Sequence, residues 1–318
     1  MDTRRWYEFF AEFEAQGSSI TYERLARTVA SQSTVIDLLE QLPTPKRQPN
    51  LLFAAARHSG VAVHDGTAFV EQLVANWDLV ADTMLQRSTQ TNEPARCGAF
   101  LPVLGGLDGP LALIEVGCSA GLCLYPDRYA ISYDGRAPLI DSSVEIAVRT
   151  YGVVPAPRAV PNVVARIGVD LNPLDVRRHD DLEWLTTLVW PEHDERRARV
   201  RATAELIANE PPTLLAGDAT ERLGDALALV PDDVTPVVFH SAVLNYFDVD
   251  TRRRFVERVT TDNRLVWLSN EGPGVLDGVT SDLDVPEAEP SNGYFILSRD
   301  GRSLAIGDPH GSWIRWPG

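Results

Sequence analysis

The feature that most limits the fold is an apolar run at residues 111–117, Leu-Ala-Leu-Ile-Glu-Val-Gly, which ends in glycine. A run without polar alternation is typical of a strand with both faces buried in a parallel sheet. Similar runs recur at 213–217, 236–240 and 264–269, and helix-compatible stretches such as 249–260 lie between them. Strands that alternate with helices predict an α/β doubly wound sheet.

The first part of the chain follows a different period. Residues 1–98 show helical spacing, for example at Trp6, Phe9, Phe10 and Phe13. This i, i+3, i+4, i+7 pattern predicts an amphipathic helix. We interpret the aromatic side chains as core and residues 1–98 as a helical cap or lid domain.

Two further segments complete the predicted organisation. At 293–308, two strand-like runs are joined by Asp-Gly, which predicts an antiparallel C-terminal hairpin. We assign residues 99–140 and 211–318 to a mostly parallel, doubly wound sheet domain. Residues 141–210 interrupt the alternation, and we interpret them as an insertion that contributes to a substrate pocket.

Composition narrows the class of partner. The 318 residues include 29 basic and 45 acidic side chains, for a net charge of −16. A field of this sign repels phosphate backbones and anionic lipids, so we expect no nucleic-acid or membrane partner. The single lysine, Lys46, lies in a Pro-rich turn. A pyridoxal-phosphate enzyme and a Walker-type P-loop both need a lysine at a defined site, and both are therefore disfavoured.

The compartment and metal content follow from a few residue types. The three cysteines, Cys97, Cys118 and Cys123, form no CxxC pair, which suits a reducing cytoplasm. The first residues lack the apolar core of a signal peptide. His179 and His193 match no ligand spacing, so we expect no metal site. A cytoplasmic protein is predicted.

The segment Glu115–Gly121, Glu-Val-Gly-Cys-Ser-Ala-Gly, lies between the buried strand and a predicted helix. Small residues let a ligand approach the backbone, and a helix N-terminus offers unpaired N–H groups. A tight turn without a ligand would have the same sequence. A nicotinamide dinucleotide site would need G-x-G-x-x-G, and here Ser119 stands at the middle glycine position.

A serine hydrolase is a second interpretation. Residues 117–121 match the G-x-S-x-G nucleophile elbow, with Ser119 as the nucleophile. Asp282 or Asp284 and then His310 would follow in hydrolase order. The hydrolase sheet needs several strands before its elbow, whereas the first hundred residues have helical periodicity.

The third interpretation is a resemblance to a known superfamily. Ile-Glu-Val-Gly-Cys-Ser-Ala-Gly resembles the E/D-x-G-x-x-x-G turn of Rossmann-like S-adenosylmethionine-dependent methyltransferases, with Glu115, Gly117 and Gly121 in place and Ser119 replacing a frequent glycine. The resemblance implies that this turn binds S-adenosylmethionine. Because this cofactor has no pyrophosphate, its ammonium and sulfonium groups favour carboxylates and carbonyls.

The resemblance also implies acidic residues at later strand ends. Asp134, 17 residues after Gly117, would hold the ribose hydroxyls, and Asp218 in Leu-Ala-Gly-Asp-Ala would lie near the adenine amine. Asp170 also ends a strand-like run and is an alternative ribose ligand. Spacing favours Asp134. The strings EVGCSAGLCLYPDRY, DLNPLDV and VVFHSAVLNY also resemble an uncharacterised bacterial family known only as a domain of unknown function.

Reactive groups are expected at the carboxyl ends of the strands. His240 is the candidate general base because its ordinary pKa lies near working pH, and Tyr246 is a candidate for shaping a methyl-transfer pocket. The candidate substrate-binding residues are Asp170, Asn172, Trp190, Glu192, Asn245 and Glu271. So many carboxylates favour an amine or guanidine acceptor.

The sequence therefore predicts a cytoplasmic, S-adenosylmethionine-dependent methyltransferase-like enzyme that acts on a small molecule. The alternatives are a serine hydrolase that uses Ser119 and a non-catalytic protein that binds S-adenosylmethionine or a nucleotide. No sequence feature indicates an oligomeric state.

Overall fold

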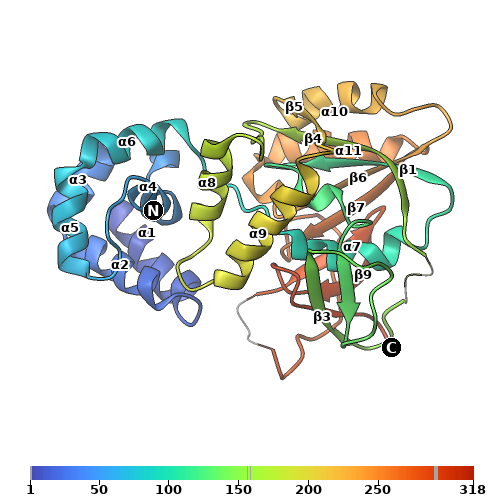
Figure 1. Ribbon diagram of the computed structural model, residues 1–318, viewed down its shortest axis with the longest axis horizontal. Helices are drawn as coiled ribbons and strands as arrows, with labels where there is room; N and C mark the ends of the chain where they lie inside the picture. Colours follow the sequence, from blue (N-terminus) through green and yellow to red (C-terminus); the bar gives the residue numbers. More distant parts are fainter. Residues whose placement is uncertain (1, 156, 158, 290–292) are drawn as a thin grey trace. The chain divides into compact units, whose positions relative to one another are not determined.

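The computed structural model describes residues 2–155, 157, 159–289 and 293–318 (Figure 1). The chain divides into two compact units. The helical unit consists of Met1–Thr91 and Arg178–Ala198, and the sheet unit consists of Asn92–Arg177 and Arg199–Gly318.

The helical unit is built from short helices with polar caps. Ser19 and Asp65 cap α2 and α5 by accepting hydrogen bonds from backbone N–H groups in the first turn. The elements are α1 (Thr3–Phe9), the π-helix η1 (Phe10–Ala15), α2 (Ile20–Ser31), α3 (Ser33–Glu40), η2 (Thr44–Lys46), α4 (Pro49–His58), α5 (Gly66–Ala75), α6 (Trp77–Gln86) and α8 (His179–Leu188). The boundary between the units falls within α9 (Asp194–Ile207).

The first aromatic stripe is only partly buried. Phe10 is buried, as predicted, but Phe9 is 42% exposed and Phe13 is 63% exposed. The prediction assumed a regular α-helix, whereas η1 is a π-helix. The additional residue per turn rotates Phe13 away from the predicted face, whereas Phe9 precedes η1 in the regular helix α1. Phe9 and Phe13 instead contact one another, with ring centroids 4.7 Å apart.

The sheet unit contains a ten-stranded sheet in its described part, in the order β2-β3-β10-β9-β8-β7-β6-β1-β4-β5. The strands are β1 (Pro110–Val116), β2 (Ala130–Tyr133), β3 (Glu145–Tyr151), β4 (Asn162–Asp170), β5 (Thr213–Ala216), β6 (Thr235–Ser241), β7 (Val266–Glu271), β8 (Phe295–Arg299), β9 (Arg302–Gly307) and β10 (Trp313–Arg315). The helices are η3 (Pro94–Arg96), α7 (Cys97–Leu104), η4 (Leu122–Leu124), α10 (Ala219–Ala228), η5 (Leu244–Tyr246) and α11 (Val249–Thr261). The predicted α/β class with a mostly parallel sheet is confirmed.

Five parallel strands, β5-β4-β1-β6-β7, form the half of the sheet that contains the glycine turn. From β1 the chain moves outward to β4 and β5, and then returns to β6 and β7 on the other side of β1. The interpretation of residues 141–210 as an insertion is therefore wrong for its first half, because this segment supplies β3 and also β4, which pairs directly with β1. The strand-like run ending at Asp170 was recognised from the sequence, but its parallel pairing with β1 was not.

The remaining strands reverse direction. β8 is antiparallel to β7, β9 to β8, and β10 to β9. The predicted hairpin at β8–β9 is confirmed, and Asp300 and Gly301 both have positive φ values, 50° and 77°, as a type I′ turn requires. β3 and β2 are parallel to β10. Consequently β2, β3 and β10 run opposite to β1.

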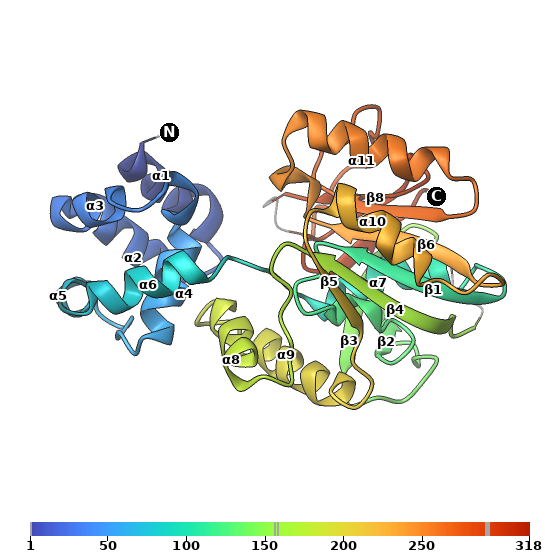
Figure 2. The ribbon, with the colours of Figure 1, turned by 90° about the horizontal axis from the view of Figure 1, so that it is seen from above.

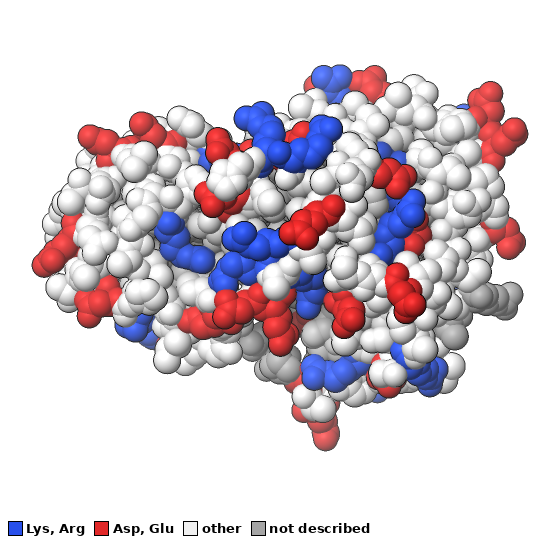
Figure 3. All heavy atoms as spheres, viewed as in Figure 1, with Lys and Arg blue, Asp and Glu red and all other residues white. Residues whose placement is uncertain are grey.

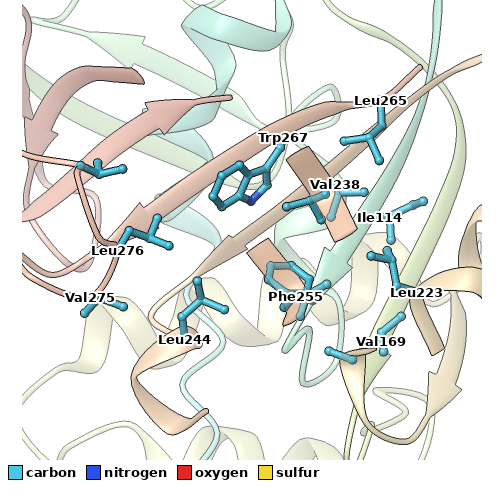
Figure 4. Packing of buried hydrophobic residues seen from close by; sticks show 14 of the residues in the cluster. Ile114, Val169, Leu223, Val238, Leu244, Phe255, Leu265, Trp267, Val275 and Leu276 are labelled. Carbon is cyan, nitrogen blue, oxygen red and sulfur yellow. The ribbon is translucent and has the colours of Figure 1, made fainter. Parts of the chain in front are cut away.

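Helices α10 and α11 cover one face of the parallel half (Figure 2). Ile114, Val238 and Trp267, from β1, β6 and β7, pack there with Leu223 of α10 and Phe255 of α11 (Figure 4). Full burial of one such side chain contributes roughly 1.5–3 kcal/mol. This cluster fixes β1 and β6 beside one another.

Helix α7 packs against the other face and shows that the sheet is curved. Phe100 of α7 lies 5.2 Å from the Phe239 ring of β6. A Cβ on Gly98 of the same helix would lie 2.6 Å from Cγ2 of Val148 in β3. In a flat sheet β3 and β6 would be about 24 Å apart, whereas a helix is roughly 10–12 Å across. The sheet therefore bends around α7.

Candidate functional site

The carboxyl ends of β1 and β6 meet where the strand order reverses, which is the position at which open α/β sheets bind ligands. The turn Glu115–Gly121 follows β1 here. Gly117 has φ 68°, and a Cβ on it would lie 2.4 Å from Cγ2 of Val243, which follows β6. Only glycine fits this conformation and this close approach.

Asp170, at the end of β4, holds the turn. Its Oδ2 accepts a hydrogen bond from the backbone N–H of Ser119 at 2.8 Å, and its Oδ1 accepts one from the N–H of Asn172 at 2.8 Å. Ser119 itself has φ 52°, which is uncommon for a residue with a side chain. The carboxylate of Asp170 thus lies directly beside the turn.

The helix expected after the turn does not form. η4 contains three residues, and the chain then leads into β2. Asn92 Oδ1 accepts hydrogen bonds from the N–H groups of Ala120 at 3.2 Å and Leu122 at 3.1 Å. Because these donors are already occupied and no long helix begins here, the turn offers little to a pyrophosphate. The dinucleotide interpretation loses its physical basis.

Two buried oxygens of the turn have no hydrogen-bond partner among the described residues: Glu115 Oε2 and Ser119 Oγ. Glu115 is 5% exposed and Ser119 is 2% exposed. Burial is the main cause that raises the pKa of Glu115 well above its usual value. Unpartnered buried oxygens are uncommon in folded proteins and indicate a place where a ligand or water completes the bonding.

Asp134 does not join this cluster. It follows β2, which runs opposite to β1, so it lies at the other edge of the sheet. Its carboxylate is exposed and accepts hydrogen bonds from the N–H and Oγ1 of Thr150. The preference for Asp134 over Asp170 as the ribose ligand is therefore wrong. The spacing of 17 residues carried no information about strand direction.

Asp218 follows β5, which is parallel to β4 and β1, so it lies at the same edge as the turn. Its side chain caps α10 by accepting hydrogen bonds from the N–H and the hydroxyl of Thr220, at 2.8 and 2.5 Å. Asp218 therefore has a structural role as the N-cap of α10, and its expected position near the adenine stays a prediction.

His240 is completely buried in β6 and bonded at both ring nitrogens. Nδ1 lies 2.7 Å from Glu271 Oε1, and Nε2 accepts a hydrogen bond from the indole N–H of Trp267 at 3.1 Å. Because an indole N–H can only donate, the ring proton must lie on Nδ1 and point to Glu271. This geometry leaves His240 no nitrogen to take a proton from a substrate, contrary to the predicted role as general base.

One oxygen of Glu271, Oε1, is engaged by the protein, whereas Oε2 is buried and has no hydrogen-bond partner among the described residues. Besides His240, its Oε1 accepts hydrogen bonds from the N–H groups of Val243 at 2.9 Å and Leu244 at 3.2 Å. Glu271 is 3% exposed. It therefore holds the segment after β6 that lies over Gly117, and we assign it a positioning role.

The remaining candidates fall into two groups. Asn172, Asn245 and Tyr246 are exposed and follow β4 or β6 at the edge that carries the turn. Trp190 and Glu192 belong to the helical unit: the Trp190 indole donates to Asn50 at 2.9 Å, and Glu192 accepts from Ser19 and Thr21. Burial opposes ionisation of Glu192, but these hydrogen bonds outweigh it and lower its pKa.

The hydrolase arrangement is not assembled. Ser119 Oγ has no hydrogen bond to a histidine in the described chain. His310, Asp282 and Asp284 are exposed. A nucleophile elbow would need a base within hydrogen-bond reach of the serine.

Two residues of the site were missed by sequence reasoning. Asn92 bonds the turn, and the buried Arg96 donates to the carbonyl oxygen of Ser241 at 3.1 Å. Both lie in the polar stretch Asn-Glu-Pro-Ala-Arg, just before the apolar helix α7. A polar stretch that is buried could be recognised only from the tertiary structure.

Comparison with known proteins places the chain in a family. Residues 4–316 match the family described as "Uncharacterized protein conserved in bacteria (DUF2332)". The chain belongs to this family. No curated protein matches the sequence.

Two further properties of this DUF2332 member concern its helices and its surface charge. Among the described residues, every helix is too short or too polar to cross a membrane. Figure 3 shows acidic and basic side chains next to one another over the face in view.

Proposed function

We propose that the protein is an S-adenosylmethionine-dependent, methyltransferase-like enzyme that acts on a small molecule. The observation that carries the proposal is the position of the turn Glu115–Gly121. It lies at the reversal of strand order, and the carboxylate of Asp170 is bonded to it at 2.8 Å. An acid at the end of β1, a glycine turn and an acid at the end of the adjacent parallel strand are the groups that the superfamily resemblance implies.

The residues present fit this cofactor better than a dinucleotide. The turn presents unpartnered oxygens, at Glu115 and Ser119, rather than free N–H groups. Oxygens suit a cofactor with ammonium and sulfonium groups, whereas N–H groups suit a pyrophosphate. Asp170 would hold the ribose hydroxyls, and Asp218, after β5, would lie toward the adenine.

The engagement of both His240 ring nitrogens is compatible with this chemistry. The bound cofactor supplies a methyl group on an activated sulfonium. The protein then has to align the acceptor and exclude water. Asn245 and Tyr246 follow β6 beside the turn and are the exposed residues best placed to contact an acceptor.

A cationic acceptor has less support than the sequence suggested. Glu192 lies in the helical unit and binds Ser19 and Thr21, and Glu271 binds backbone N–H groups after β6. Both carboxylates therefore bond groups of the protein itself, which weakens the argument for an amine or guanidine acceptor. We propose a small-molecule acceptor without assigning its charge.

The test is isothermal titration of the full chain with S-adenosylmethionine, S-adenosylhomocysteine, NAD and ATP. We expect the first two ligands to bind, and the other two to bind at least about tenfold more weakly. A thermal-shift assay gives a second readout, because a ligand at 100 times its Kd stabilises the folded state by about 2.7 kcal/mol. Stronger binding of NAD, or no binding of either sulfur nucleoside, would overturn the proposal.

A further inference from the structure

Arg96 brings a guanidinium group to the carboxyl end of β6, beside the end of β1. It belongs to η3 and is 5% exposed. Nη1 donates to the carbonyl oxygen of Ser241 at 3.1 Å, and Nε donates to that of Pro309 at 2.9 Å. The β1–β6 register pairs Glu115 with Phe239, so Ser241 lies level with Gly117. The cation is therefore held beside the glycine turn.

The charge of Arg96 has no carboxylate within salt-bridge distance among the described residues. Both of its hydrogen bonds go to neutral carbonyls, and its Nη2 has no bond within the part of the chain described. The neighbouring acid Glu93 instead bonds Arg199 at 2.8 Å. Buried arginines are almost always paired, because an uncompensated charge is costly to remove from water.

Glu115 does not compensate this charge directly. Its side chain forms no ion pair with Arg96, although the charge of Arg96 lowers its pKa. Burial has the larger effect, so the pKa of Glu115 is raised overall. The hydrogen bonds of Arg96 therefore go to the carbonyl oxygens of Ser241 and Pro309, and neither partner carries a charge that balances the guanidinium. An ion pair with Arg96 therefore requires an anionic ligand from outside the described residues.

We propose that Arg96 binds the α-carboxylate of the sulfonium cofactor, an inference that rests on the proposed function. The carboxylate is the only anionic group of S-adenosylmethionine and S-adenosylhomocysteine. Guanidinium groups bind carboxylates through short, charge-assisted hydrogen bonds. The Nη2 of Arg96 is available for such a bond.

The test compares two ligands that differ in this one end. S-adenosylhomocysteine carries the amino-acid carboxylate, whereas 5′-methylthioadenosine keeps the nucleoside and the sulfur but lacks it. Isothermal titration measures the Kd of each ligand for the wild-type chain and for the Arg96→Gln variant. We expect the substitution to weaken S-adenosylhomocysteine binding by about tenfold to a hundredfold. Binding of methylthioadenosine should stay within about twofold.

Arg199→Gln is the matched control, because Arg199 is paired with Glu93. It should not change the ratio of the two affinities. Arg96→Lys should recover part of the preference for S-adenosylhomocysteine. Unchanged methylthioadenosine binding also reports that the variant is folded.

The two hypotheses fail in different ways. Equal loss of both ligands in Arg96→Gln, or no loss of either, would overturn the carboxylate assignment alone. A wild-type chain that binds neither ligand would overturn the proposed function and this inference together.

Discussion

At the scale of single residues, Glu115 is the most informative side chain of the site. It sits on a strand that is otherwise apolar, and burial raises its pKa well above the usual 4.5. The folded chain therefore holds a proton that the unfolded chain releases as the pH rises past that value. Folding stability that is fully present below about pH 4.5 is consequently lost as the pH rises toward the folded-state pKa.

This protonation predicts the effect of Glu115→Gln. The amide mimics the protonated acid, so the variant should lack this loss and become more stable relative to wild type as the pH rises. Between the unfolded-state and folded-state pKa values of Glu115, the free energy of unfolding of the wild type falls by about 1.4 kcal/mol per pH unit. Urea unfolding at several pH values measures the difference. Glu257→Gln, on an exposed position of α11, is the control and should show no such trend. Parallel curves for wild type and Glu115→Gln would contradict the prediction.

At the scale of secondary-structure elements, periodicity predicted most strands, while strand direction had to come from the structure. The apolar runs located β1, β5, β6 and β7, and Asp-Gly located the β8–β9 hairpin. A count of residues between Gly117 and Asp134 could not reveal that β2 runs opposite to β1, because direction depends on pairings with β3 and β10, far along the chain. The position of β4 beside β1 likewise depends on a pairing between strands that are far apart in the sequence.

Strand direction predicts different roles for two similar aspartates. Asp170 ends β4 and Asp134 follows β2, and each accepts a hydrogen bond from a backbone N–H, of Ser119 and Thr150 respectively. We expect Asp170→Asn to weaken S-adenosylhomocysteine binding at least about tenfold, since a hydrogen bond to a charged group contributes roughly 1.5–3 kcal/mol. Asp134→Asn should leave binding within about twofold. Isothermal titration of both variants with S-adenosylhomocysteine shows which aspartate contributes to binding, and circular dichroism verifies that both variants are folded. A larger effect at Asp134 would restore the assignment made from spacing.

At the scale of the whole molecule, the chain forms two compact units with separate cores. Helical periodicity predicted that the N-terminal part would be distinct from the sheet. It could not predict that residues 178–198 return to that part, because the contacts of α8 and its flanks lie far away in sequence. Asp181, for example, accepts from Arg87 at 2.7 Å, and the Trp184 indole donates to Ser88 at 3.1 Å.

The returning helix α8 predicts where a core mutation acts. Trp184 is completely buried, and its ring lies 5.6 Å from that of His58 in α4. Trp184→Ala should destabilise the helical unit by about 3–5 kcal/mol through the cavity it leaves. Hydrogen exchange measures this locally: amides of α4 and α6 should exchange faster, while those of β1 and β6 keep their protection. Leu79→Ala, at a position 55% exposed on α6, should have little effect. Equal loss of protection in both units would mean that they unfold as one cooperative body, because the cavity lies within the helical core alone.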